Sequence, residues 1–145
     1  MQVLEVRNAE LIRSLTEQAA KQGITDAAIV TLIGAVDDFT VSTTPAEDPT
    51  SHNISRYPLP AEMTATGEFI GGKPHIHVVM GVAGDRAIAG HLIKAQLGTS
   101  FARAFVIPTE QPIALLASEG VVVEEFPDAA PAGRGRINDT RTPPR

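Results

Sequence analysis

Three histidines have a spacing that suits metal binding. His75 and His77 flank Ile76 in a segment, 75–82, that the pattern predicts to be a strand. Because side chains alternate across a strand, both imidazoles are expected on one face. His91 follows on the next predicted strand, 86–97. Three imidazoles can hold zinc, iron, nickel or copper and leave a coordination position open for a ligand.

Ordinary histidines are the alternative interpretation, since an H-x-H pair alone is a weak signal. Three further side chains are candidates for catalysis: Glu62 and Glu68, which flank the predicted site in sequence, and His52 in a long loop. Each glutamate could hydrogen-bond a metal ligand or act as a general base. Either glutamate could equally well be an ordinary solvated carboxylate. For His52, a solvated loop residue without a chemical role is the favoured interpretation.

The metal hypothesis constrains the hairpin between the two histidine strands, because directly opposed residues of an antiparallel pair share a face. A two-residue turn at 84–85 would place His91 opposite Val78, on the wrong face. A three-residue loop at 83–85 would place it opposite His77, and one at 84–86 opposite Val79. We therefore expect an odd loop, or a bulge that changes the parity.

Other chemistry is mostly excluded or weakly supported. The chain has no cysteine, which removes thiol nucleophiles, iron–sulfur clusters and Cys-type zinc sites. No Gly-x-Ser-x-Gly elbow is present. Gly71-Gly72-Lys73 lacks the P-loop pattern, so a glycine turn before Pro74 is a better interpretation than a phosphate cradle.

The elements that must position the histidines are one helix and several short strands. Helical periodicity predicts a helix over 9–22, with Asn8 as its N-cap and Gly23 at its end. Strands are expected near Ile54 and over 27–36, 39–43, 61–66, 75–82, 86–97, 101–107 and 120–126. This order predicts an α+β domain, a mostly antiparallel sheet crossed by the N-terminal helix.

Composition and charge predict one acidic domain with a short tail. The 145 residues carry 17 acidic and 12 basic side chains, a net charge of −5. We divide the chain into a domain over 1–126, with a net charge of −7, and a flexible Pro-, Gly- and Arg-rich tail over 127–145, with a net charge of +2. Neither a signal peptide nor an apolar run long enough to span a membrane is visible, so a cytoplasmic location is expected.

The histidines also carry a family resemblance. Ala61-Glu62-Met63, Gly67, Pro74-His75-Ile76-His77 and Gly90-His91-Leu92 together resemble the plants-and-prokaryotes conserved (PPC) domain, over roughly residues 3–126. The resemblance implies a homotrimer with a metal, expected to be zinc, on His75, His77 and His91. Two departures stand out. Ala89 replaces one glycine of the usual G-G-H-L, and 101–105 lacks the usual glutamate, which puts a catalytic role for that glutamate in doubt here.

Two functions remain open, besides a trimer whose metal is incidental. The first is a metal-dependent enzyme or small-ligand binder. The second is a DNA-binding or regulatory module, since members of the family are often described as DNA-binding. Arg134-Gly135-Arg136 resembles the core of an AT-hook but is followed by Ile137 instead of proline. The acidic body also opposes DNA, whose phosphates repel it.

Overall fold

The sheet and helix predicted from the sequence are present in the computed structural model, which describes residues 1–113. The class is α+β, and every strand pairing is antiparallel. In chain order the elements are β1 (Gln2–Arg7), α1 (Leu11–Gln22), β2 (Ala27–Val36), β3 (Asp38–Thr43), β4 (Asn53–Tyr57), β5 (Ala61–Ile70), β6 (Lys73–Val82), β7 (Arg86–Gln96) and β8 (Phe101–Pro108).

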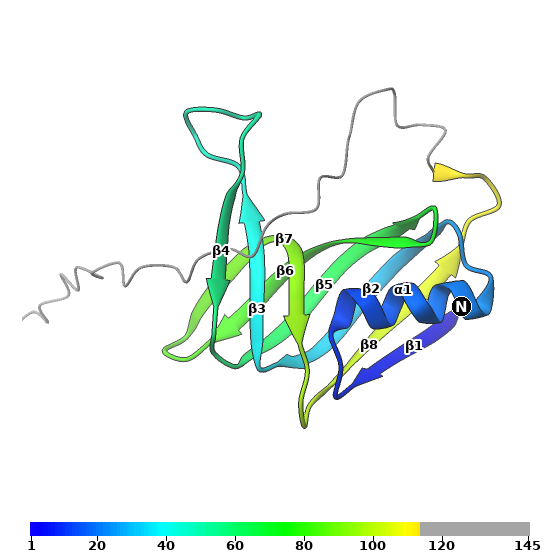
Figure 1. Ribbon diagram of the computed structural model, residues 1–145, viewed down its shortest axis with the longest axis horizontal. Helices are drawn as coiled ribbons and strands as arrows, with labels where there is room; N and C mark the ends of the chain where they lie inside the picture. The colour runs from blue at the N-terminus through cyan, green and yellow to red at the C-terminus, as the bar shows by residue number, and fades with distance from the viewer. Residues whose placement is uncertain (114–145) are drawn as a thin grey trace, which may run out of the picture.

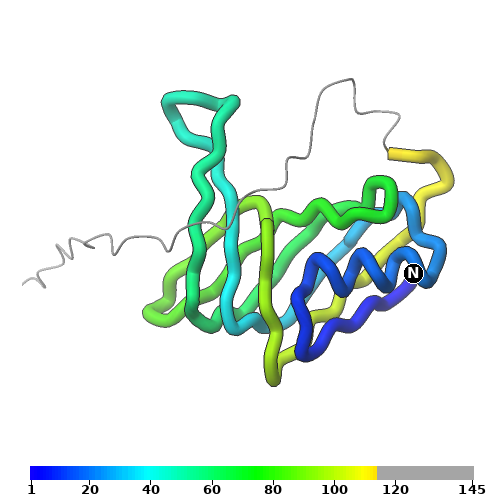
Figure 2. Tube along the Cα trace, in the orientation of Figure 1, coloured from blue at the N-terminus to red at the C-terminus, as the bar shows by residue number. Residues whose placement is uncertain are grey.

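All eight strands form one sheet that curls around α1. Their order is β1-β8-β2-β5-β6-β7-β3-β4. The helix packs against β1 at one edge and against β6 and β7 farther along, so the sheet must bend to reach it from both sides (Figures 1 and 2). A bridge between Glu10 and Gln96 joins the start of the helix to the end of β7. The sheet therefore has an inner face, toward α1, and an outer face.

The helix begins later than the sequence pattern predicted, and the predicted cap is wrong. Asn8 has a left-handed backbone, with φ of 46°, and Glu10 is the N-cap. The Glu10 carboxylate accepts hydrogen bonds from the backbone N–H groups of Ile12 (3.0 Å) and Arg13 (2.7 Å). It also accepts one from Ala95 N on β7 (3.2 Å). Glu10 replaces Asn8 as the cap because its longer side chain can accept hydrogen bonds from the first turn of the helix and from β7 at the same time.

Alternation along the strands separates the apolar core from the polar surface. On β6 the side chains of Ile76, Val78 and Met80 are buried, whereas the alternate residues His75 and His77 are exposed. On α1 the stripe of Leu11, Leu15 and Ala19 is fully buried, as its helical spacing predicts. The core thus lies between the helix and the inner face, and the histidines of β6 project from the outer face.

The boundaries show where the sequence pattern was incomplete. The strand over 27–36 is confirmed, and the short strand near Ile54 is β4. β5 and β6 are longer than predicted and meet at Gly71-Gly72, both left-handed, which confirms the glycine turn. β1 was not predicted, although its alternating Val3, Leu4, Glu5 and Val6 suit a strand. The predicted strand 120–126 and the tail 127–145 lie outside the described residues.

No helix within residues 1–113 is long and apolar enough to cross a bilayer.

One glycine on β5 is required by the close approach of β6. A Cβ at Gly67 would collide with the carbonyl oxygen of His75 and lie 3.0 Å from Ile76 Cα. These are backbone atoms of a paired strand, so they cannot move aside without disturbing the ladder that positions His75.

Gly67→Ala should therefore lower the free energy of unfolding by about 1–3 kcal/mol, the usual cost of overpacking. Urea denaturation of the purified variant measures this change. Thr64→Ala, at an exposed position of the same strand, is the control and should cost less than about 1 kcal/mol. Equal stabilities of the two variants would show that the strands separate easily at Gly67.

Candidate metal centre

The turn between β6 and β7 has the parity that the metal hypothesis requires. Val82 pairs with Arg86, so the loop consists of residues 83–85, the first of the two odd loops considered. Gly84 and Asp85 have positive φ values of 82° and 56°, which a short hairpin loop needs. This register places His91 directly opposite His77. The predicted common face of the histidines is confirmed.

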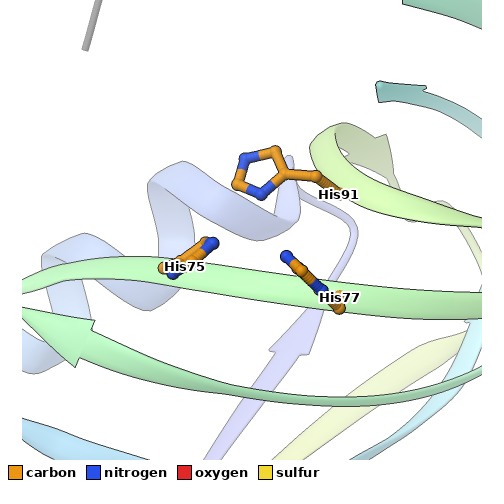
Figure 3. Close-up of side chains that lie close together, drawn as sticks. All are labelled: His75, His77 and His91. Atoms are coloured by element: carbon orange, nitrogen blue, oxygen red, sulfur yellow. The ribbon is translucent and has the colours of Figure 1, made fainter. Parts of the chain in front are cut away.

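The three imidazoles converge above the outer face of β6 and β7 (Figure 3). One ligand nitrogen from each of His75, His77 and His91 lies within 4.8 Å of the other two. The ring centroids are 4.9 Å apart for His75 and His91, 5.1 Å for His75 and His77, and 5.6 Å for His77 and His91. His75 and His77 are exposed and His91 is half-buried, so the cluster is open to solvent.

Glu68 hydrogen-bonds one of the histidines. The two-residue turn Gly71-Gly72 pairs Glu68 with His75, and His75 Nδ1 lies 3.1 Å from Glu68 Oε1. When Nδ1 carries the proton, it donates to this carboxylate and leaves the lone pair of Nε2 available to a metal. Of the roles considered for Glu68, that of a hydrogen-bonding partner of a ligand is the one this contact suits.

Glu62 and His52 occupy different positions. Glu62 is on the same strand as Glu68 but six residues away, paired with Gly81, where it lines a shallow cavity of about 230 Å³ beside Ala35 and Ser100. His52 directly precedes β4. Within residues 1–113 the group of clustered ligand atoms consists of His75, His77 and His91, without either of these residues.

His91 is held in the neutral form that a metal ligand needs. Burial lowers the pKa of His91 to about 4, and the nearby imidazoles of His75, His77 and His52 lower it in the same direction. An imidazole with this pKa is unprotonated at neutral pH and presents a free lone pair. His52 is therefore within electrostatic reach of His91, although it is not part of the cluster.

Two further residues lie next to the cluster: Thr66, which was not singled out from the sequence, and Gly90, which was quoted only as part of the family motif. Thr66, exposed on β5, is paired with His77, so its hydroxyl is on the histidine side of the sheet. Gly90 allows β7 to approach β3, since a Cβ there would lie 2.7 Å from Ser42 O. The exposed neighbour Ala89 has no such constraint, which explains why this chain tolerates alanine there. The glycine turn at 71–72 was the available signal for Thr66, because it fixes the pairing of β5 with β6.

The donor set fits a divalent transition metal. Three imidazole nitrogens are typical ligands of zinc and of neighbouring first-row metals. Two nitrogens of a tetrahedral zinc site lie roughly 3.3–3.4 Å apart, given the usual Zn–N distance of about 2.0–2.1 Å. The spacing of up to 4.8 Å is wider, so the exposed rings would have to rotate toward one another to bind one ion.

Solved structures share this fold. A metal-containing protein from Archaeoglobus fulgidus is 26% identical, with a TM-score of 0.61, and the match covers 74% of this chain and 77% of that one. A plant- and prokaryote-conserved protein from Pyrococcus horikoshii is 19% identical, with a TM-score of 0.66 and coverages of 77% and 80%. A protein from Bacteroides thetaiotaomicron, provisionally named as DNA-binding, is 19% identical, with a TM-score of 0.66 and coverages of 76% and 79%.

A comparison with curated proteins found no match. The match to a protein family is extensive, however. The Plants and Prokaryotes Conserved (PCC) domain matches residues 3–110, which include the helix, the three histidines and all eight strands except the first residue of β1. The chain therefore belongs to the Plants and Prokaryotes Conserved domain family, the PPC family that its histidine motifs resemble.

Proposed function

We propose that this protein binds one divalent metal ion, expected to be zinc, through His75, His77 and His91. The observation that carries the proposal is the convergence of three imidazole nitrogens within 4.8 Å on adjacent strands. The neutral state of His91 and the hydrogen bond from His75 to Glu68 both favour metal ligation. The similar protein from Archaeoglobus fulgidus, described as metal-containing, gives further support.

With three protein ligands, the ion would keep a coordination position open, which suggests that it binds a further ligand. Structural zinc sites usually have four protein ligands, whereas sites that bind a substrate keep one position free. Here the cluster is exposed on the outer face, so a small molecule has access to it. A metal in such a site can polarise a carbonyl group or lower the pKa of a bound water. The residues of this chain would bind the ion, orient His75 through Glu68, and place the Thr66 hydroxyl beside His77.

DNA binding is the second candidate. It is favoured by the provisional DNA-binding name of the protein with this fold from Bacteroides thetaiotaomicron. The charge of the described residues opposes it, since residues 1–113 carry twelve acidic and eight basic side chains, a net of −4. Any affinity for DNA should consequently be weak and should fall steeply as salt is added.

Metal analysis of the purified full chain tests the first proposal. After removal of bound metal with a chelator and addition of zinc, elemental analysis should give about one zinc per chain. His91→Ala should abolish stoichiometric binding, whereas His52→Ala should retain it. Loss of zinc from both variants would contradict the three-histidine assignment. Salt-titrated DNA binding, measured on the same samples, would favour the second candidate if it persisted at physiological salt without metal.

The hydrogen bond from Glu68 predicts a graded effect. Glu68→Gln should weaken zinc affinity about 10–100-fold, because a neutral amide orients and polarises His75 less well than a carboxylate. Competition with a chromophoric chelator measures the affinity. Glu62→Gln is the matched control, at the far end of the same strand face, and should leave it unchanged. An equal loss in both variants would point to a general charge effect.

We also propose that the protein is a homotrimer, as the family resemblance implies. Ile33 and Val79, each 44% exposed, lie in one row of the outer face on either side of Thr64. Exposed apolar side chains in a row are typical of an association surface.

Light scattering at micromolar concentration should give a trimer mass. Ile33→Asp should shift the mass toward the monomer, because a charge would be buried at the contact. Ala20→Asp, at an exposed position of α1, should not change it. A stable monomer of the unaltered chain would contradict the proposal.

A further inference from the structure

A second feature of the outer face is an apolar column along the β1–β8 edge. Val3, Val30 and Ile107 are 51%, 49% and 47% exposed, although each is a large apolar side chain. Phe105, paired with Val3 and only partly buried, lies between them. The helix covers the opposite face, so within residues 1–113 nothing covers this column. We call these four residues the edge patch.

The edge patch ends at two arginines held by one carboxylate. Arg7 Nε and Arg103 Nε each donate a hydrogen bond of 2.6 Å to a different oxygen of Glu5. Both guanidinium groups also lie over the ring of Phe101, with their central carbons 5.2 Å and 4.5 Å from its centroid. Phe101 and Glu5 thus hold two positive charges close together. The single negative charge of Glu5 compensates only one of them.

This arginine pair has unused capacity to bind an anion. Each guanidinium has about five N–H donors, whereas a carboxylate accepts about four hydrogen bonds. The pair is also held in place by Glu5 and Phe101, so a further carboxylate would order less side-chain structure when it binds. Arg103 is four residues from Ile107 on β8, roughly 13 Å along the strand. From Ile107 to Arg103, the surface along β8 therefore changes from apolar to cationic.

The described chain ends beside the apolar end of this surface. After β8, Thr109 N donates to Asp26 O at 3.0 Å, and Ile113 N donates to Asp26 Oδ1 at 2.9 Å. Asp26 directly precedes β2, whose first residue is paired with Pro108. Residue 113 is consequently held at the Ile107 end of the column, opposite the end where the arginine pair lies.

The sequence beyond residue 113 contains a segment with the complementary order. Residues 121–126 are Val-Val-Val-Glu-Glu-Phe, so three apolar residues precede two acidic ones. Seven residues lie between Ile113 and Val121. The eight steps from one to the other can span up to about 26–29 Å. The next part, 127–145, has a net charge of +2 and would be repelled by the arginine pair. Residues 114–120 also run from apolar to acidic but carry a single glutamate, so the two adjacent glutamates of 121–126 are the better match to two arginines.

We propose that residues 121–126 bind to the edge patch of their own chain. The valines lie over Val3, Phe105 and Ile107, and the glutamates reach the arginine pair. The occupant is thus a segment of this protein, placed antiparallel to β8 by the direction in which the chain leaves. The assignment also explains Arg103, which stands in the strand where the family resemblance leads one to expect a glutamate.

The absence of cysteine allows a direct test by disulfide formation in the full-length chain. The variant Val3→Cys with Val123→Cys is equilibrated in a glutathione redox buffer, and its effective thiol concentration is measured. The control is Ala20→Cys with Val123→Cys, because Ala20 is exposed on α1, on the other side of the sheet. We expect the first pair to close within one chain with an effective concentration at least about tenfold higher than the control.

Charge reversal tests the role of the arginine pair. Adding Glu124→Lys and Glu125→Lys to the first cysteine pair should lower the effective concentration several-fold, and further adding Arg103→Glu should restore it at least in part. Circular dichroism and zinc content, which should not change, verify folding. Equal values for both cysteine pairs, or no effect of charge reversal, would overturn the proposal. A disulfide that forms only between chains would do the same, by placing the segment on a neighbouring copy.

Discussion

The pairing of His77 with His91 is the constraint on which the candidate site depends. Because strand side chains alternate, a change of one residue in the β6–β7 register would send His91 to the inner face. The loop over 83–85 prevents this change, and the left-handed residues Gly84 and Asp85 make so short a loop possible. On the other side of β6, the turn at Gly71-Gly72 sets the register that brings Glu68 to His75. Two short turns therefore assemble three ligands and one carboxylate.

The curled sheet keeps this cluster on the surface. Helix α1 occupies the inner face, where it buries Leu11, Leu15 and Ala19 against apolar strand residues. Glu10 closes the arrangement, since its carboxylate caps the helix and also accepts a hydrogen bond from β7. With the inner face filled by apolar side chains, the polar residues of β5, β6 and β7 must face outward. The core thus determines which face can carry chemistry.

Charge divides the outer face into two regions. Where β6 and β7 pair, three imidazoles gather beside the carboxylate of Glu68, a set suited to a cation. At the β1–β8 edge, Arg7 and Arg103 around Glu5 make a region suited to an anion. Glu5 stays ionised between them, because the hydrogen bonds from Arg103 and Arg7 lower the pKa of its carboxyl group. The two regions are separated by the uncharged outward side chains of β2 and by Thr64 and Thr66 of β5, so a metal and a protein segment need not compete.

The sequence by itself determined the class of fold, the helix, most strands and the three histidines, since these follow from short-range periodicity and residue type. It missed β1, whose outward side mixes Val3 with Glu5 and Arg7 and so blurs the alternation of apolar and polar residues. It favoured Asn8 as the cap because asparagine is a common N-cap residue. The contact of Glu10 with Ala95, 85 residues away, is not visible in the local pattern. Tertiary structure alone decided which odd loop joins β6 to β7, and that His75 contacts Glu68 while Glu62 lies apart. These outcomes depend on strand register and strand order. The local sequence pattern is compatible with several registers, so it cannot decide which residues of neighbouring strands come into contact.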